Sequence, residues 1–115
     1  MTPIELAKHY FDMSNESGFD KIKLVFNDSS TYCSGTGELF VGVKDILVMQ
    51  RAYHGSFKTL NWQVNHADEI KPGIIVIDFD FQGKSLAEEN VEYSGIEYII
   101  VHDGKIQHID VRRND

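Results

Sequence analysis

The spacing of hydrophobic residues changes from a helical period to a period of two near residue 59, and this change constrains the fold more than any other feature. Before it, apolar side chains recur every three or four residues, as they do on one face of a helix. After it, apolar and polar side chains alternate, as they do on a strand with one buried and one wet face. A helical first half followed by strands predicts an α+β fold.

Three segments of the first half show helix signals. Thr2 and Glu5 have the spacing of a capping box, with a proline between them that suits the first helical position. A later segment has Ile46, Met49 and Tyr53 on one helical face. Helices are therefore expected over residues 2–14, 18–26 and 43–55, with a short strand over 30–34 and a turn region over 34–39.

The second half predicts four strands joined as an antiparallel meander, over residues 59–66, 74–84, 91–101 and 105–111. The first should place Leu60, Trp62, Val64 and His66 on one face, and the second Ile75, Ile77, Phe79 and Phe81. We expect a single domain, residues 1–115, in which a strongly curved, mostly antiparallel sheet wraps around three N-terminal helices. Such a sheet leaves an open-ended cone, which is a natural place for a pocket.

The last two strands raise the question of a chemical site. Asp103-Gly104 is a strong signal for a two-residue hairpin turn, and such a turn fixes the register. It predicts that Glu97 faces Asp110 and that Ile99 faces His108. Two carboxylates held together in a pocket cannot both ionise easily, so one should keep its proton well above its ordinary pKa of ~4. With an imidazole beside them, these groups could perform general acid-base chemistry.

Two alternatives to this acidic pair stay open. The acids can be ordinary solvated strand residues, neutralised by Arg112 or Lys105. A one-residue bulge in either strand would also change every pair beyond it.

Composition excludes several classes of partner. The chain has 18 acidic and 11 basic residues and a net charge of −7, which argues against nucleic acid and anionic membrane surfaces. Its apolar runs are of strand length, so no membrane span is expected. One cysteine, Cys33, cannot form an internal disulfide, which favours a reducing compartment and a cytoplasmic location. No histidine pair has metal-site spacing, so no metal site is expected.

Two stretches resemble a known family. IVHDGKIQHIDV is similar to the closing pattern of the SnoaL-like branch of the nuclear transport factor 2-like (NTF2-like) superfamily. GELFVGVKDILVMQRAYHGSF is similar to the segment of that branch in which a glycine precedes a helix and an aromatic residue then leads into the first long strand. Members include ketosteroid isomerases, polyketide cyclases, scytalone dehydratase and limonene epoxide hydrolase. The resemblance implies a cone with an apolar pocket, and a homodimer formed through the outer face of the sheet.

The resemblance also indicates site residues. The closing-strand match gives His108 and Asp110, and Tyr10 lies where family members often place a pocket tyrosine. With Glu97 from the hairpin, the catalytic candidates are Asp110, His108, Glu97 and Tyr10. The ligand-binding candidates are Trp62, His66, Tyr53 and Phe79. For two of these residues a structural role is the alternative. A tryptophan on an alternating face, such as Trp62, is more often part of the core than a ligand platform, and His66 fits a hydrogen-bonded structural histidine better than a base.

The leading functional hypothesis is an enzyme or enzyme-like protein that holds a small apolar molecule, cyclic or open-chain, in the cone. Asp110 would take a proton, and protonated Glu97 or Tyr10 would hydrogen-bond the developing oxyanion. Isomerisation, cyclisation, dehydration and hydrolysis all fit this arrangement without a cofactor. A non-catalytic small-molecule binding module and a dimeric interaction protein remain as alternatives.

Overall fold

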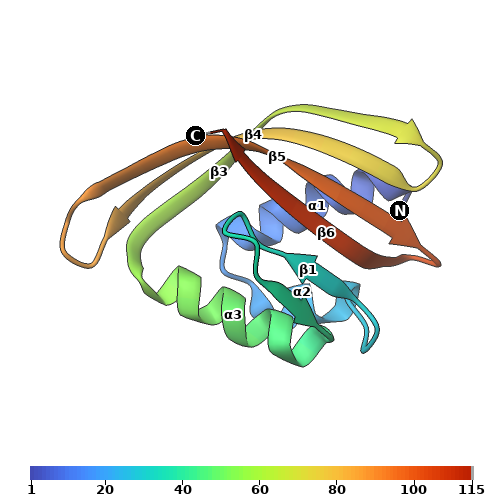
Figure 1. Ribbon diagram of the computed structural model, residues 1–115, viewed down its shortest axis with the longest axis horizontal. Coiled ribbons are helices and arrows are strands. Elements are labelled where there is room, and N and C mark those ends of the chain that lie inside the picture. Colours follow the sequence, from blue (N-terminus) through green and yellow to red (C-terminus); the bar gives the residue numbers. More distant parts are fainter. Residues whose placement is uncertain (115) are drawn as a thin grey trace.

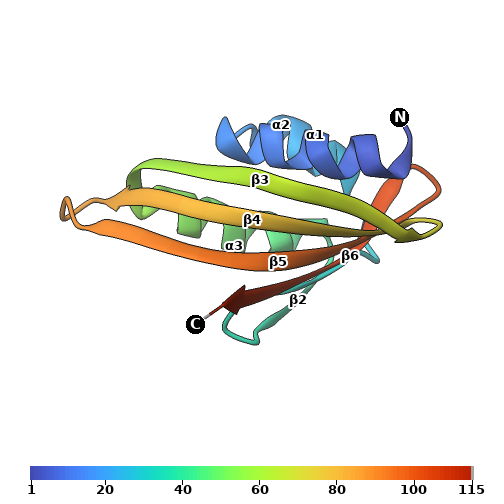
Figure 2. The same ribbon diagram turned by 90° about the horizontal axis from the view of Figure 1, so that it is seen from above.

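A computed structural model describes residues 1–114 and contains one sheet with helices on its concave side. The elements are α1 (Pro3–Asn15), α2 (Phe19–Ile22), η1 (Lys23–Val25), β1 (Thr31–Cys33), β2 (Leu39–Val41), α3 (Val43–Gly55), β3 (Phe57–Lys71), β4 (Ile74–Ser85), β5 (Asn90–His102) and β6 (Lys105–Asn114). The strand order is β2-β1-β6-β5-β4-β3, and all pairs are antiparallel except β1 with β6. Figure 1 shows the sheet arching over α3, and Figure 2 shows β3, β4 and β5 side by side with α1 along the β3 edge.

The helices follow the predicted order, with one difference in arrangement. The capping box at the start of α1 is present, since the Thr2 amide donates to Glu5 Oε1 at 2.8 Å and the Glu5 amide to Thr2 Oγ1 at 3.3 Å. The predicted second helix is one α-helical turn followed by a 3₁₀ turn, and two short strands precede α3. The prediction of three N-terminal helices is therefore only partly right. No helix within residues 1–114 is both long and apolar enough to cross a membrane.

The meander of four long strands is confirmed, because β3 to β6 pair in sequence order. On β4, alternate side chains are buried as the period of two predicted, and these are Ile75, Ile77, Phe79 and Phe81. The turn between β5 and β6 has positive φ at Asp103 (55°) and Gly104 (74°), as a two-residue primed turn requires. One strand was missed: β2 begins in the segment that the sequence predicted as a turn.

A bulge in β6 changes the predicted register of the last hairpin. Val101 pairs with Ile106 as expected, but the next pair is Ile100 with His108, so Gln107 is an extra residue. An extra residue turns every later side chain of that strand to the opposite face.

The predicted pairing of Glu97 with Asp110 is therefore wrong. Glu97 pairs with Val111 on the concave face of the sheet, and Asp110 pairs with Tyr98 on the convex face. A bulge in either strand was one of the alternatives that the sequence left open.

A second bulge lies in β3. The register with β4 shifts between Val64 and His66, which makes Asn65 the extra residue. His66 is consequently exposed, and Ala67 packs against the core in its place. The prediction that His66 points the same way as Trp62 is wrong for this reason.

Candidate functional site

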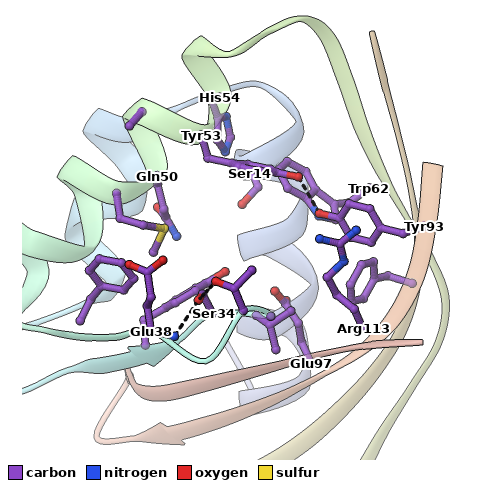
Figure 3. A pocket seen from close by; sticks show the side chains of 18 of the residues that line it. Ser14, Ser34, Glu38, Gln50, Tyr53, His54, Trp62, Tyr93, Glu97 and Arg113 are labelled. Atoms are coloured by element: carbon purple, nitrogen blue, oxygen red, sulfur yellow. Dashed lines mark hydrogen bonds between the residues drawn. The ribbon is translucent and has the colours of Figure 1, made fainter. Parts of the chain in front are cut away.

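A cavity of about 500 Å³ lies between α1, α3 and the concave face of the sheet (Figure 3). Its size falls within the range of ~300–1,000 Å³ that is usual for small-molecule pockets. The apolar part of the wall includes Phe11, Phe40, Met49, Trp62, Phe79 and Val111. Polar groups contributed by several elements interrupt this wall, and they include Tyr10, Gln50, Tyr53, Tyr93, Glu97 and Arg113.

The side chain of Asn15 fixes one wall of the cavity. Its Nδ2 donates to the Trp62 carbonyl at 2.9 Å, and its Oδ1 accepts from the Trp62 amide at 2.6 Å. The end of α1 is thereby tied to the middle of β3, beside the indole ring that lines the cavity.

Glu97 is the buried acid of the site. The alternation of β5 places it on the concave face, where it is 4% exposed. Burial raises the pKa of its carboxyl to about 8, because desolvation penalises the charged form. Its Oε2 has no hydrogen-bond partner within residues 1–114. At neutral pH this carboxyl holds a proton and faces the cavity.

Tyr10 and Gln50 form a second buried polar pair. Gln50 Nε2 donates to the Tyr10 hydroxyl oxygen at 2.7 Å, and both side chains are about 95% buried or more. Burial raises the pKa of Tyr10, with a smaller contribution from the charge of Glu97, so the phenol stays neutral. Gln50 Oε1, like Glu97 Oε2, lacks a partner in the described chain. Buried polar atoms are nearly always hydrogen-bonded, so two unpartnered oxygens at one cavity indicate groups that a ligand or water would satisfy.

Tyr53, Tyr93 and Arg113 form a third polar group. The two tyrosine hydroxyls are 2.8 Å apart and hydrogen-bonded, and burial raises the pKa of both. The Arg113 guanidinium lies 3.8 Å from the centre of the Tyr93 ring. Figure 3 shows these three side chains converging at one side of the cavity.

His54 lies at the α3 end of the cavity, between two aromatic rings. Its ring centre is 4.8 Å from that of Phe19 and 5.3 Å from that of Trp62. Its Nδ1 is hydrogen-bonded to Ser17 Oγ at 2.8 Å. Burial lowers the pKa of this imidazole to about 4, so it is neutral at physiological pH.

The structure brings five of the eight predicted site residues to the cavity, namely Tyr10, Tyr53, Trp62, Phe79 and Glu97. The other three, His66, His108 and Asp110, are absent from its wall. His108 Nδ1 is hydrogen-bonded to Thr31 Oγ1 at 2.7 Å. Whether any of the eight acts in catalysis or binding stays a prediction.

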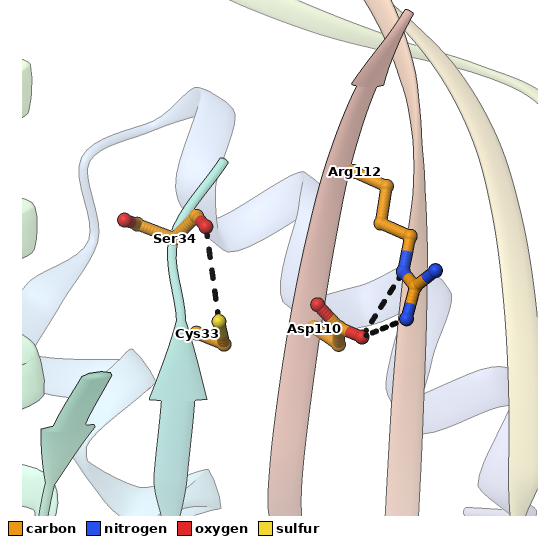
Figure 4. A network of polar contacts seen from close by, with 4 residues as sticks. All are labelled: Cys33, Ser34, Asp110 and Arg112. Atoms are coloured by element: carbon orange, nitrogen blue, oxygen red, sulfur yellow. Dashed lines mark hydrogen bonds and ion pairs between the residues drawn. The ribbon is translucent and has the colours of Figure 1, made fainter. Parts of the chain in front are cut away.

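Asp110 has a partner on its own strand. Its Oδ2 accepts from Arg112 Nη2 at 3.1 Å, in the ion pair drawn in Figure 4. In the parallel pairing of β1 with β6, Asp110 lies beside Cys33. The structure thus shows the neutralisation by Arg112 that the sequence analysis held open as the alternative to an acidic pair.

The polar residues of the wall that were missed include Gln50, His54, Tyr93 and Arg113. Gln50 is four residues after Ile46 and three before Tyr53, so helical spacing could have placed it on the same face. Tyr93 shares the period of two with Glu97 on β5. Arg113 lies beyond the expected end of the last strand, and only the bulge turns it toward the concave face. Within residues 1–114, no three His, Cys, Asp or Glu side chains gather into a group that could hold a metal ion.

No family model and no curated protein matches the sequence, but solved structures match it closely in fold. A Shewanella putrefaciens protein assigned as a SnoaL-like polyketide cyclase has a TM-score of 0.87 at 12% identity, over 96% of this chain and 88% of its own. An NTF2-like protein of unknown function from Exiguobacterium has a TM-score of 0.85 at 18% identity, over 95% of this chain and 98% of its own. An LEH-like epoxide hydrolase of M. tuberculosis has a TM-score of 0.85 at 12% identity, over 97% of this chain and 82% of its own. This chain has the NTF2-like fold. At these identities the NTF2-like fold is what is shared, and function has to be argued from the site.

Proposed function

We propose that the protein binds a small, largely apolar molecule in the cavity and that Glu97 exchanges a proton with it. The observation that carries the proposal is a buried carboxyl with an unpartnered oxygen at the wall of a 500 Å³ cavity. The NTF2-like fold is shared with proteins assigned as a polyketide cyclase and an epoxide hydrolase, which supports the same class of function here.

The raised pKa suits Glu97 to this role. With a pKa of about 8, the protonated form predominates at pH 7 and can donate to a ligand oxygen. The minor ionised form is a stronger base than an ordinary glutamate, because its conjugate acid has the higher pKa. The role first assigned to Asp110 therefore passes to Glu97, which lies on the concave face.

Tyr10 is the proposed partner of Glu97. Its hydroxyl oxygen already accepts a hydrogen bond from Gln50, and its O–H can donate to a ligand or to the neighbouring Ser14 hydroxyl. A ligand carbonyl placed between the two residues would receive this donor as negative charge develops on its oxygen, while Glu97 removes a proton from the adjacent carbon. Isomerisation, cyclisation and dehydration each contain such a step.

A model reaction can test Glu97 before the natural ligand is known. The compound 5-nitrobenzisoxazole is a small apolar ring that opens when a base removes its carbon-bound proton. The electrons of that C–H bond form the nitrile, the N–O bond breaks, and a coloured phenolate is released. The wild-type rate should rise as Glu97 ionises, with a midpoint near pH 8.

Glu97→Gln should abolish this dependence because it removes the base and keeps the shape. Glu92→Gln is the matched control, since Glu92 lies exposed on the same strand and should leave the rate unchanged. A wild-type rate equal to that of Glu97→Gln across the pH range would refute proton transfer by Glu97. Quenching of Trp62, the only tryptophan, without any rate enhancement would favour the non-catalytic binding module instead.

A further inference from the structure

Arg113 is held in place at the rim of the cavity by its neighbours. The residue opposite it on β5 is Gly95, so no side chain stands between it and the ring of Tyr93. On its other side is Gly35, where a Cβ would come within 2.8 and 2.9 Å of Arg113 Cδ and Cγ. The side chain therefore lies between a glycine and an aromatic ring, which fixes the direction of its guanidinium.

Among residues 1–114, no acid neutralises the charge of Arg113. Its neighbour Arg112 forms an ion pair with Asp110, but Arg113 forms none with any residue in the range 1–114. Glu38 is a further acid of the cavity wall, and Figure 3 shows it across the cavity from Arg113. Arg113 is exposed at the rim, and it is the one Lys or Arg side chain among the residues that line the cavity.

The tyrosine pair beside Arg113 supplies a further donor. Each hydroxyl has one proton, and the bond of 2.8 Å between Tyr53 and Tyr93 uses one of the two. The other proton remains available to an acceptor. A guanidinium next to a free phenol donor is well suited to a carboxylate, which accepts several hydrogen bonds at once.

Arg113 and Glu97 are separated along the sheet. The pair Gly95–Arg113 lies two residues from the pair Glu97–Val111, which corresponds to about 7 Å at the usual rise of a strand. Burial alone accounts for the raised pKa of Glu97, with no contribution from the charge of Arg113. The Glu97 end of the cavity is thus neutral at pH 7, and the Arg113 end has a positive charge.

We infer that Arg113, with the Tyr53–Tyr93 hydroxyl pair, binds the carboxylate of the ligand. The ligand is then an apolar monocarboxylic acid that has a carbonyl or hydroxyl oxygen some 7 Å or more from the carboxylate, at the end that Glu97 contacts. The inference rests on the proposed function for the Glu97 end, and it narrows the ligand from an apolar molecule to an apolar acid.

A matched pair of probes tests the inference. The compound 6-hydroxy-2-naphthoate has a hydroxyl and a carboxylate at opposite ends of a rigid apolar body, and its methyl ester lacks only the charge. Isothermal titration calorimetry should show that the wild type binds the acid about tenfold more tightly than the ester. In Arg113→Gln that ratio should fall to about one, and Arg113→Lys should restore part of it.

Arg112→Gln is the matched control, since it removes the same charge from the adjacent residue of β6 and should keep the ratio. An acid preference that survives in Arg113→Gln, or one lost equally in Arg112→Gln, would overturn the assignment. Equal binding of acid and ester to the wild type, with an effect of Glu97→Gln on both, would overturn it while the proposed function stands. Binding of neither probe would count against the ligand pocket itself and against this inference with it.

Discussion

Raising the pH from 5 to 9 should destabilise the protein through Glu97, and replacing Glu97 by Gln should remove this effect. The carboxyl has a pKa of about 8 in the folded chain and about 4.5 when unfolded. Between these values the folded state binds more protons than the unfolded state, so stability falls as the pH rises. The stabilising contribution of the protonated form is fully present below pH 4.5 and is lost as the pH approaches and passes 8.

The size of the effect follows from the pKa difference. Each pKa unit corresponds to ~1.4 kcal/mol, so a difference of about 3.5 units gives up to roughly 5 kcal/mol. This is comparable to the lower end of the total stability of natural domains, about 5–15 kcal/mol. Glu97→Gln keeps the shape and hydrogen-bonding capacity of the neutral acid. It should match the wild type near pH 5 and exceed it in stability above pH 8.

Urea unfolding at several pH values measures this difference. The fluorescence of Trp62 reports on unfolding, because its ring packs 4.9 Å from that of Phe81 in the core. Glu92→Gln, an exposed change on the same strand, should follow the wild-type curve at every pH. If the free energy of unfolding depends on pH in the same way for the wild type and for Glu97→Gln, the argument that Glu97 is buried without a compensating charge is refuted.

Three further predictions concern other parts of the chain. Asp110→Asn should lower the free energy of unfolding by less than about 1 kcal/mol, because it breaks only a surface ion pair; a larger loss in urea unfolding would contradict the convex position of Asp110. Gly73→Ala should be less stable than Gly37→Ala by about 1–3 kcal/mol in the same assay, since both have positive φ but only the Cβ at Gly73 would meet a backbone oxygen, at 2.6 Å. The imidazole of His54 should titrate near pH 4 by NMR, and folding stability should fall as the pH drops below its unfolded value of 6.5 toward that pKa; an ordinary titration would mean that the ring is solvated.

Local sequence signals were sufficient for the elements that depend on neighbouring residues. The capping box of Thr2 and Glu5 marked the start of α1, and the hairpin turn at Asp103-Gly104 needed only residues that accept positive φ. The alternation on β4 identified its buried face. Each of these features is decided within a few residues, so the tertiary structure had little to add.

The composition of the site was predictable in part, for a related reason. Glu97 and Phe79 reach the cavity because strand alternation puts them on the concave face, and Tyr10 because of its position on α1. Arg113 could not be placed in the same way. Its orientation depends on a bulge that lies six residues earlier in the chain.

The sequence by itself determined the α+β class, the order of the main helices and the four long strands, and the period of those strands. The tertiary structure decided the phase of that period beyond Asn65 and Gln107, where a bulge turns the following side chains over. In β6 the buried Ile106 and Ile109 are three residues apart, so the apolar pattern does change phase there, but whether a strand bulges at such a point depends on how it curves over the helices and on its pairing with the neighbouring strand. For this reason the sequence indicated an acidic site at the last hairpin, and only the tertiary structure decided that Glu97 reaches the cavity and Asp110 does not.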